Sequence, residues 1–106
     1  MKQYSVYSVN LDPTIGSEIR KTRPGVIISP QEMNIHLNTI IIVPMTSMQR
    51  GHYPTRQHVK GKNFEGYLVI DQIRTVDKSR LYKYIGELNK DDIKKLKLIL
   101  KEMLID

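Results

Sequence analysis

Apolar and polar residues alternate over short stretches along most of the chain, which is the pattern of half-buried β-strands. The β-branched run over 39–43 suits a strand buried on both faces, and residues 56–60 suit an exposed edge strand. Pro44 is expected to end the buried strand and to place Thr46 and Ser47 in the following loop. In all, strands are predicted over residues 5–11, 25–29, 39–43, 56–60, 67–76 and 82–85.

The end of the chain has a helical period instead. Asn89 is a suitable N-cap, and apolar residues recur every three or four positions after it. Leu98 and Ile105 lie off this apolar face and are candidates for a subunit contact. A further turn of helix is expected within 31–38. The apolar face of the C-terminal helix comprises Ile93, Leu96, Leu100, Met103 and Leu104.

Length and pattern together predict one small domain over residues 1–106. A chain of 106 residues suffices for one domain and is too short for two. Short strands, too few for a sandwich, with one C-terminal helix predict a mainly β (α+β) fold, a small half-open barrel with a helix packed on it. The longest apolar run, over 40–45, is too short to span a membrane, and the first residues do not resemble a signal peptide. A cytoplasmic protein without membrane association is therefore expected.

The charge is positive and unevenly distributed. There are 17 Lys and Arg against 11 Asp and Glu, which gives a formal net charge of +6. No acidic residue lies between Glu32 and Glu65, a stretch that contains all three histidines and several basic residues. Such a segment suits a polyanion such as RNA or DNA, and a solvated surface loop explains it equally well.

The loop over 12–24 concentrates candidate chemistry. It runs for more than ten residues between two predicted strands, a length typical of functional or mobile loops. It carries Glu18 together with Arg20, Lys21 and Arg23, and the proline that follows holds Arg23 in an extended conformation. On charge alone, an ordinary solvated loop is the simpler interpretation.

The remaining polar residues form no recognisable catalytic motif. Thr46 and Ser47 lack a Ser-His-Asp arrangement, and hydroxyls in such places commonly cap turns. Asp71 interrupts an apolar run and needs a partner, either as a structural acceptor or as a carboxylate that orients an arginine of the site. The histidines lack metal-ligand spacing and the chain has no cysteine, so neither a metal nor another cofactor is expected.

Several motifs resemble the MazF/PemK family of toxin endoribonucleases. The segment LDPTIGSEI at 11–19, followed by KTRP at 21–24, is similar to the signature loop of that family. The resemblance spans nearly the whole chain, and it implies a compact SH3-like barrel with a C-terminal helix, assembled as a homodimer. It continues in family order through VIISP at 26–30, VPMTS at 43–47, YPTR at 53–56, DQIRTVD at 71–77, RL at 80–81 and IGEL at 85–88.

This resemblance implies metal-independent cleavage of single-stranded RNA, with messenger RNA the expected target, at short sequence motifs. In the family reaction the 2′-hydroxyl of the RNA is the nucleophile, and the products carry 2′,3′-cyclic phosphate and 5′-hydroxyl ends. Arg23 matches the essential arginine of the family, Thr46 its essential hydroxyl residue, and Glu18 an acid of the loop. An arginine is a poor general base, because its pKa exceeds about 12. Arg23 is therefore expected to stabilise charge and donate a proton, and Thr46 to bind the phosphate.

The same resemblance also indicates which residues contact the RNA. Asp71 matches a carboxylate assigned to catalysis or base contacts in the PemK branch. Ser17 stands where that branch has a catalytic histidine, so a histidine-based mechanism does not transfer. The loops over 48–52 and 59–65 are the variable parts that select the RNA sequence. Residues expected to contact RNA are Ser47, Arg20, Lys21, Arg56, Asp71 and Gln72.

The family further implies a labile, MazE-like antitoxin whose acidic, disordered tail covers the basic groove, and the charge of +6 suits such a partner. Two other classes of function stay open. A gyrase poison related to CcdB would share the fold, but those relatives use a C-terminal segment with a tryptophan, which this chain lacks. A non-catalytic RNA-binding module would stack bases on Tyr53 or Tyr67 and leave the RNA intact.

Overall fold

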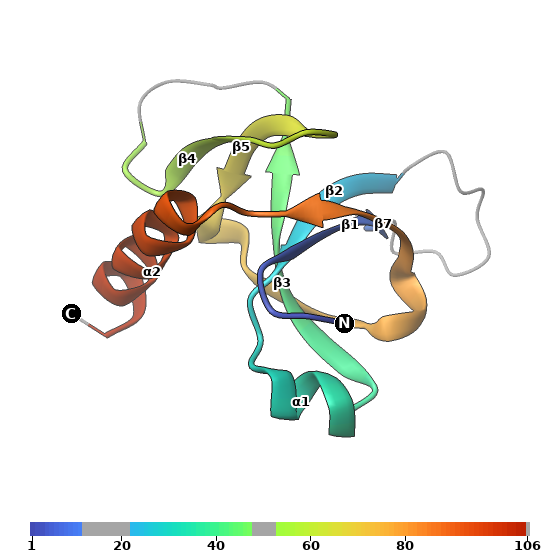
Figure 1. Cartoon of the computed structure of the whole chain (residues 1–106). Coiled ribbons are helices and arrows are strands. Elements are labelled where there is room, and N and C mark those ends of the chain that lie inside the picture. Colours follow the sequence, from blue (N-terminus) through green and yellow to red (C-terminus); the bar gives the residue numbers. More distant parts are fainter. Residues whose placement is uncertain (12–21, 48–52, 106) are drawn as a thin grey trace.

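The computed structural model describes residues 1–11, 22–47 and 53–105. In this part of the chain seven antiparallel strands form one curled sheet, in the order β4-β5-β3-β2-β1-β7, with β6 beside the first half of β3 (Figure 1). The strands are β1 (Ser5–Asn10), β2 (Thr22–Ile27), β3 (Thr39–Thr46), β4 (Arg56–Lys60), β5 (Glu65–Val69), β6 (Arg74–Asp77) and β7 (Leu81–Glu87). The helices are α1 (Gln31–His36), α2 (Lys90–Leu104) and the short 3-10 turns η2 (Ile70–Gln72) and η3 (Lys78–Arg80).

Strand β3 is the centre of the sheet. One of its edges pairs with β2, while its other edge pairs first with β6 and then with β5. The segment that was predicted as one strand over 67–76 is therefore two strands, separated by η2. The prediction was wrong because β3 pairs with both β6 and β5 along one edge, and the chain bends between these two strands at η2, where Ile70 is buried and Asp71 exposed.

Strand β3 also continues through Pro44 to Thr46, which corrects the prediction that Pro44 ends it. Along the edge shared by β6 and β5, the last β6 partner is Ile42 and the first β5 partner is Met45. Pro44 lies in the gap between these two ladders, where its missing N–H interrupts no ladder hydrogen bond on that edge. Thr46 consequently ends a strand and does not belong to the loop.

The central strands are buried on both faces, as predicted for 39–43. Neighbouring residues of β2, Val26 and Ile27, enter two different apolar clusters, and Val43 and Ile42 of β3 do the same. Because successive side chains of a strand point to opposite faces, the two clusters lie on opposite sides of the sheet. This burial fixes the strand register that places the polar side chains at the strand ends.

Helix α2 covers one of these clusters, beside the β4–β5 hairpin (Figure 1). Its predicted N-cap is confirmed, since Asn89 Oδ1 accepts a hydrogen bond of 2.8 Å from the backbone N–H of Asp92. Leu96 is fully buried, whereas Leu104, also assigned to the apolar face, is 61% exposed and borders an apolar hollow between the end of α2 and Ile41 of β3. Within the described residues, no helix is long and apolar enough to cross a bilayer.

Candidate active site

An open groove of about 700 Å³ lies where the ends of β2 and β3 meet β4, η2 and β6. Among its lining residues three are arginines and none is acidic, so within the described part of the chain the groove wall is basic. It brings together five of the residues selected from the sequence, which lie up to 49 positions apart: Arg23, Thr46, Ser47, Arg56 and Gln72. The lining is completed by Leu11, Pro44, Met45, Val69 and Arg74.

Arg23 and Thr46 come from adjacent antiparallel strands. The register between β2 and β3 pairs Gly25 with Pro44, and each of the two functional candidates lies two residues beyond that pair. Side chains two residues apart in a strand share a face, so both point to the side on which the groove opens. Arg23 is exposed and Thr46 half-buried, as expected for a cation and a hydroxyl at the wall of an open groove.

Arg56 is held in a defined position on the opposite wall. Its Nε donates to Asp71 Oδ1 at 3.1 Å and its Nη2 donates to Asp71 Oδ2 at 3.4 Å. Thr55 Oγ1 donates to the same carboxylate at 3.1 Å, and the guanidinium carbon lies 5.6 Å from the centre of the Tyr53 ring. A two-pronged ion pair and an aromatic face thus orient this guanidinium.

Asp71 is therefore an exposed residue of η2 and not an isolated carboxylate inside a strand. The hydrogen bond from Arg56 is the main cause that lowers the pKa of Asp71 below its ordinary value. Of the two roles considered for Asp71, this contact supports the orientation of an arginine of the site. Its side chain does not itself line the groove, unlike that of Gln72, the next residue.

Arg74 is a groove residue that was not selected from the sequence. It begins β6, is exposed, and also borders a second hollow of about 540 Å³. Arg74 thus joins the groove to a hollow that extends toward the start of β7. The second hollow is lined in addition by Asn10, Thr75, Val76, Asp77, Ser79 and Arg80. The DQIRTVD motif at 71–77 contains a signal for this residue, because Arg74 lies two positions after Gln72.

Three predicted site residues, Glu18, Arg20 and Lys21, lie outside the described residues. The ends of their loop are nevertheless defined, because Asn10 pairs with Thr22 at the open end of the β1–β2 ladder. The neighbours of this pair, Leu11 and Arg23, both line the groove. The described residues on both sides of this loop therefore lie next to the groove.

The protein is thus a curled antiparallel sheet with one packed C-terminal helix and a basic groove at its strand ends. Such a groove suits the binding of a polyanion. Residues 2–104 match the family described as PemK-like, MazF-like toxin of type II toxin-antitoxin system. The chain belongs to this family.

Named relatives agree with this assignment. The chain is 30% identical over 101 residues to endoribonuclease EndoA of Bacillus subtilis, an alignment that covers 91% of this chain and 87% of the relative. It is 29% identical to endoribonuclease MazF of Staphylococcus saprophyticus, with 91% and 84% covered. The prediction of a MazF/PemK-type endoribonuclease toxin is thus confirmed at the level of the family.

Solved structures have the same fold. An endoribonuclease from a mycobacterial species, in complex with its cognate antitoxin, superposes with a TM-score of 0.82 at 26% identity and covers 98% of this chain and 94% of its own. MazF from Deinococcus radiodurans gives a TM-score of 0.82 at 24% identity, with 98% and 96% covered. The predicted mainly β architecture with a C-terminal helix is confirmed.

Proposed function

We propose that this protein cleaves single-stranded RNA in the groove, without a metal ion and at a specific short sequence, as the toxin of a toxin–antitoxin pair. The observation that carries the proposal is that Arg23 and Thr46 line one groove, from adjacent strands, together with Arg56 and Arg74. Three guanidinium groups around one open groove favour a phosphodiester backbone, since arginine binds phosphate oxygens through paired, charge-assisted hydrogen bonds. Messenger RNA is the proposed target.

The substrate supplies the nucleophile in this proposal. The 2′-oxygen of one ribose attacks the adjacent phosphorus and loses its proton, the bond from phosphorus to the 5′-oxygen breaks, and that oxygen takes up a proton. The products are a 2′,3′-cyclic phosphate and a 5′-hydroxyl end. Because DNA lacks the 2′-hydroxyl, it binds in the groove without being cleaved.

The proposed roles of the individual residues differ. Arg23 stabilises the charge that develops on the phosphate oxygens and donates the proton to the leaving 5′-oxygen. Thr46 donates its hydroxyl hydrogen bond to the phosphate. Glu18 either accepts the proton of the 2′-hydroxyl or influences the charge of Arg23. Arg20, Lys21, Ser47, Arg56 and Gln72 contact the RNA, and Asp71 contributes by positioning Arg56.

The test is the cleavage of a long single-stranded RNA in excess EDTA, with the new ends mapped and their chemistry determined. Discrete cuts with cyclic-phosphate and 5′-hydroxyl ends are expected, absent in Arg23→Ala and retained in Lys95→Ala, an exposed cation of α2 outside the groove. RNA that is bound but stays intact would replace this proposal with a non-catalytic binding module. RNA that is neither bound nor cut would favour the gyrase poison.

We also propose an antitoxin partner whose acidic segment occupies the groove. The net charge of +6 and the basic groove wall support it, as does the similarity to a mycobacterial endoribonuclease solved with its cognate antitoxin. Binding of the neighbouring gene product is expected to weaken with salt and with Arg56→Ala. Undiminished binding by Arg56→Ala at all salt concentrations would place the partner elsewhere.

A homodimer is the proposed assembly, with Leu98 of α2 and Ile105, which follows the helix, as contact residues. Leu98 and Ile105, which lie off the packed face, are 56% and 78% exposed. Light scattering is expected to give twice the mass of the chain for the wild type and a lower mass for Leu98→Glu. A wild-type protein that stays monomeric at high concentration would refute the dimer.

A further inference from the structure

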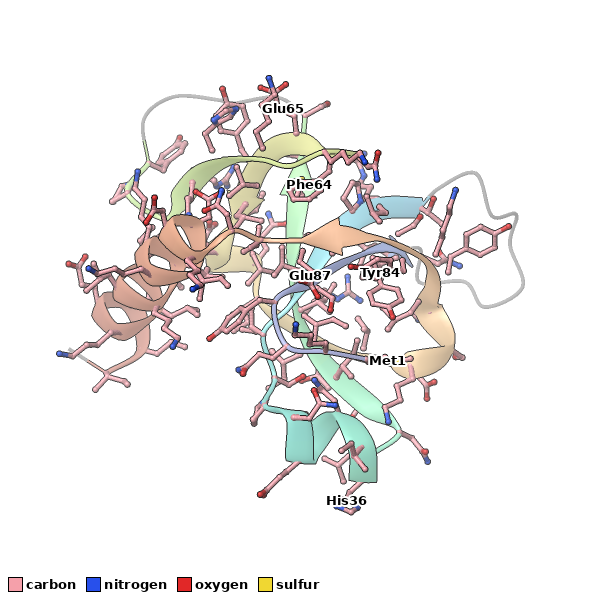
Figure 2. All side chains as sticks on the ribbon, in the orientation of Figure 1. Met1, His36, Phe64, Glu65, Tyr84 and Glu87 are labelled. Carbon is pink, nitrogen blue, oxygen red and sulfur yellow. The ribbon has the colours of Figure 1, made fainter. Side chains whose placement is uncertain are left out.

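A cluster of three polar and aromatic side chains lies on the β4–β5 hairpin, outside the groove: His58, Glu65 and Tyr67. The rings of His58 and Tyr67 have their centres 5.1 Å apart at a tilt of 53°. His58 Nε2 lies 3.0 Å from Glu65 Oε2, and the side chains of both residues are about half exposed, at 49% and 56%. Figure 2 shows Glu65 on the outside of the hairpin, whereas Phe64 beside it points back toward the sheet.

The strand register connects this cluster to the proposed catalytic threonine. Thr46 of β3 pairs with Tyr67 of β5, and Tyr67 pairs with His58 of β4, so the three residues form one row across three strands. Residues paired in this way point to the same face of a sheet. Neighbouring strands lie about 4.8 Å apart, which puts Tyr67 about 5 Å and His58 about 10 Å from Thr46 along the row.

The neighbouring strand pair, Arg56 and Val69, shows that Tyr67 and His58 lie on the same face of the sheet as the groove. Arg56 pairs with Val69, and both line the groove. They lie two residues from His58 and Tyr67 on the same two strands, hence on the same face. The aromatic cluster is therefore a direct continuation of the groove wall, at the distance of a neighbouring nucleotide from the phosphate site.

We propose that Tyr67 and His58 form a stacking subsite for a base adjacent to the cut, with the Glu65 carboxylate holding the His58 ring in place. The proposal rests on the proposed cleavage of RNA in the groove. Aromatic and imidazole rings bind single-stranded RNA by stacking on its bases. A phosphate is a poor fit, because the Glu65 carboxylate repels it, whereas the arginines of the groove accept it. In this arrangement the RNA backbone lies along the arginines of the groove, and one base turns toward the Tyr67 and His58 rings.

The test combines protein variants with a series of RNAs that each lack one base within the mapped cut site. For the wild type, removal of the stacked base is expected to lower kcat/KM about tenfold or more, the usual effect of losing one stacked base. Tyr67→Ala should lower kcat/KM on the intact RNA by a similar factor and should lose its sensitivity to that one abasic position alone. Tyr67→Phe should behave like the wild type, and His58→Ala should show a smaller effect at the same position.

Tyr82→Ala is the matched control, since Tyr82 is an exposed tyrosine of β7 that lines neither the groove nor the cluster. It should keep the full wild-type abasic profile. Circular dichroism melting curves of each variant show whether the hairpin is still folded, and the exposed His58 provides a second variant if Tyr67→Ala unfolds.

The same abasic series with 2′-deoxy sugars, which cannot be cleaved, is titrated by fluorescence anisotropy in parallel. Failure of the wild type to cut any RNA would refute the proposed function, while weaker binding of an unselected single-stranded RNA by Tyr67→Ala than by Tyr82→Ala would still test the subsite. An unchanged abasic profile in folded Tyr67→Ala and His58→Ala, in both cleavage and binding, would overturn the stacking subsite. An equal loss at every position would assign these residues a structural role only.

Discussion

Arg23 and Thr46 each lie two residues beyond the paired Gly25 and Pro44 on adjacent antiparallel strands, so that both side chains open into one groove. The two residues are far apart in the sequence, and only the β2–β3 register brings them together. That register depends in turn on burial on both faces, by the paired Val26 and Val43 on one side and the paired Ile27 and Ile42 on the other. The apolar core thereby determines where the proposed catalytic groups stand.

The first prediction concerns Arg23. Arg23→Ala should lower kcat/KM for RNA cleavage by about 100- to 1000-fold, the usual effect of removing a donor that stabilises the transition state. Arg23→Lys should recover only part of this loss, because an ammonium group lacks the forked geometry of guanidinium. Since Arg23 is exposed, the melting temperature should change little. Cleavage kinetics in EDTA test the prediction, and full activity of Arg23→Ala would remove Arg23 from the site.

The second prediction concerns the ion pair between Arg56 and Asp71. The pKa of Asp71 is lowered in the folded protein from its ordinary value of 3.8, chiefly by the hydrogen bond from Arg56. A carboxylate with a lowered folded-state pKa stabilises the fold above pH 3.8, and the stabilisation disappears as the pH falls through the lowered value. Because the Asp71 side chain is 41% exposed, solvent screening limits the effect to about 0.5 kcal/mol.

Asp71→Asn isolates this effect. Urea unfolding should show the variant slightly less stable than the wild type at pH 7, and the difference should shrink as the pH falls below 3.8 through the lowered pKa of Asp71. The same variant should raise KM for RNA more than it lowers kcat, since Arg56 loses its orientation while the groove stays intact. An undiminished stability difference at the lowest pH would show that the pair does not act through the Asp71 charge.

The helix at the end of the chain could be predicted because its signals are local. The N-cap Asn89 and the first turn involve neighbours in the sequence, and the spacing of Ile93 and Leu96 directly gives one packed face. The exposure of Leu104 was not predictable in this way, because it depends on how closely the last turn packs against distant residues such as Ile28 and Ile41, with which it lines an open hollow.

The break between β5 and β6 at η2 depends on tertiary pairing, and the sequence around it contains no clear local signal for it. The apolar run before Asp71 fits one long strand, but β3 takes two different partners along one edge, and the chain must bend between them. The same gap explains why Pro44 is tolerated within a strand. Arg74 reaches the groove because β6 begins directly after this bend.

The third prediction concerns Gly66, where β5 passes close to β3. A Cβ atom at this position would lie 2.7 Å from the Thr46 carbonyl oxygen and 2.8 Å from Met45 Cγ. Because a backbone oxygen cannot move aside, Gly66→Ala should push β5 away from β3 and destabilise the fold by about 1–3 kcal/mol. The displacement would also reach Thr46, so activity should fall even where the protein remains folded.

Gly86→Ala is the matched control for Gly66→Ala. The nearest atom to its added Cβ would be Phe64 Cε2 at 3.3 Å, a side-chain contact that can relax. Chemical denaturation of the two variants should therefore give a clearly larger loss of unfolding free energy for Gly66→Ala. Equal losses would mean that β5 adapts at Gly66 without strain.

The fourth prediction concerns Arg74, which joins the groove to the second hollow. If RNA follows this basic surface, Arg74→Ala should weaken binding to all single-stranded RNA sequences by a similar factor, since a phosphate contact carries no base information. The slope of log K against log salt should decrease by about 0.7, the value for one phosphate contact on a single strand. The control is Lys95→Ala, an exposed cation on α2 whose removal changes the net charge equally. Fluorescence anisotropy over a range of salt concentrations measures both slopes. A slope unchanged by Arg74→Ala would mean that the RNA leaves the groove by another route. A slope reduced equally by Lys95→Ala would mean that only the overall charge acts at Arg74.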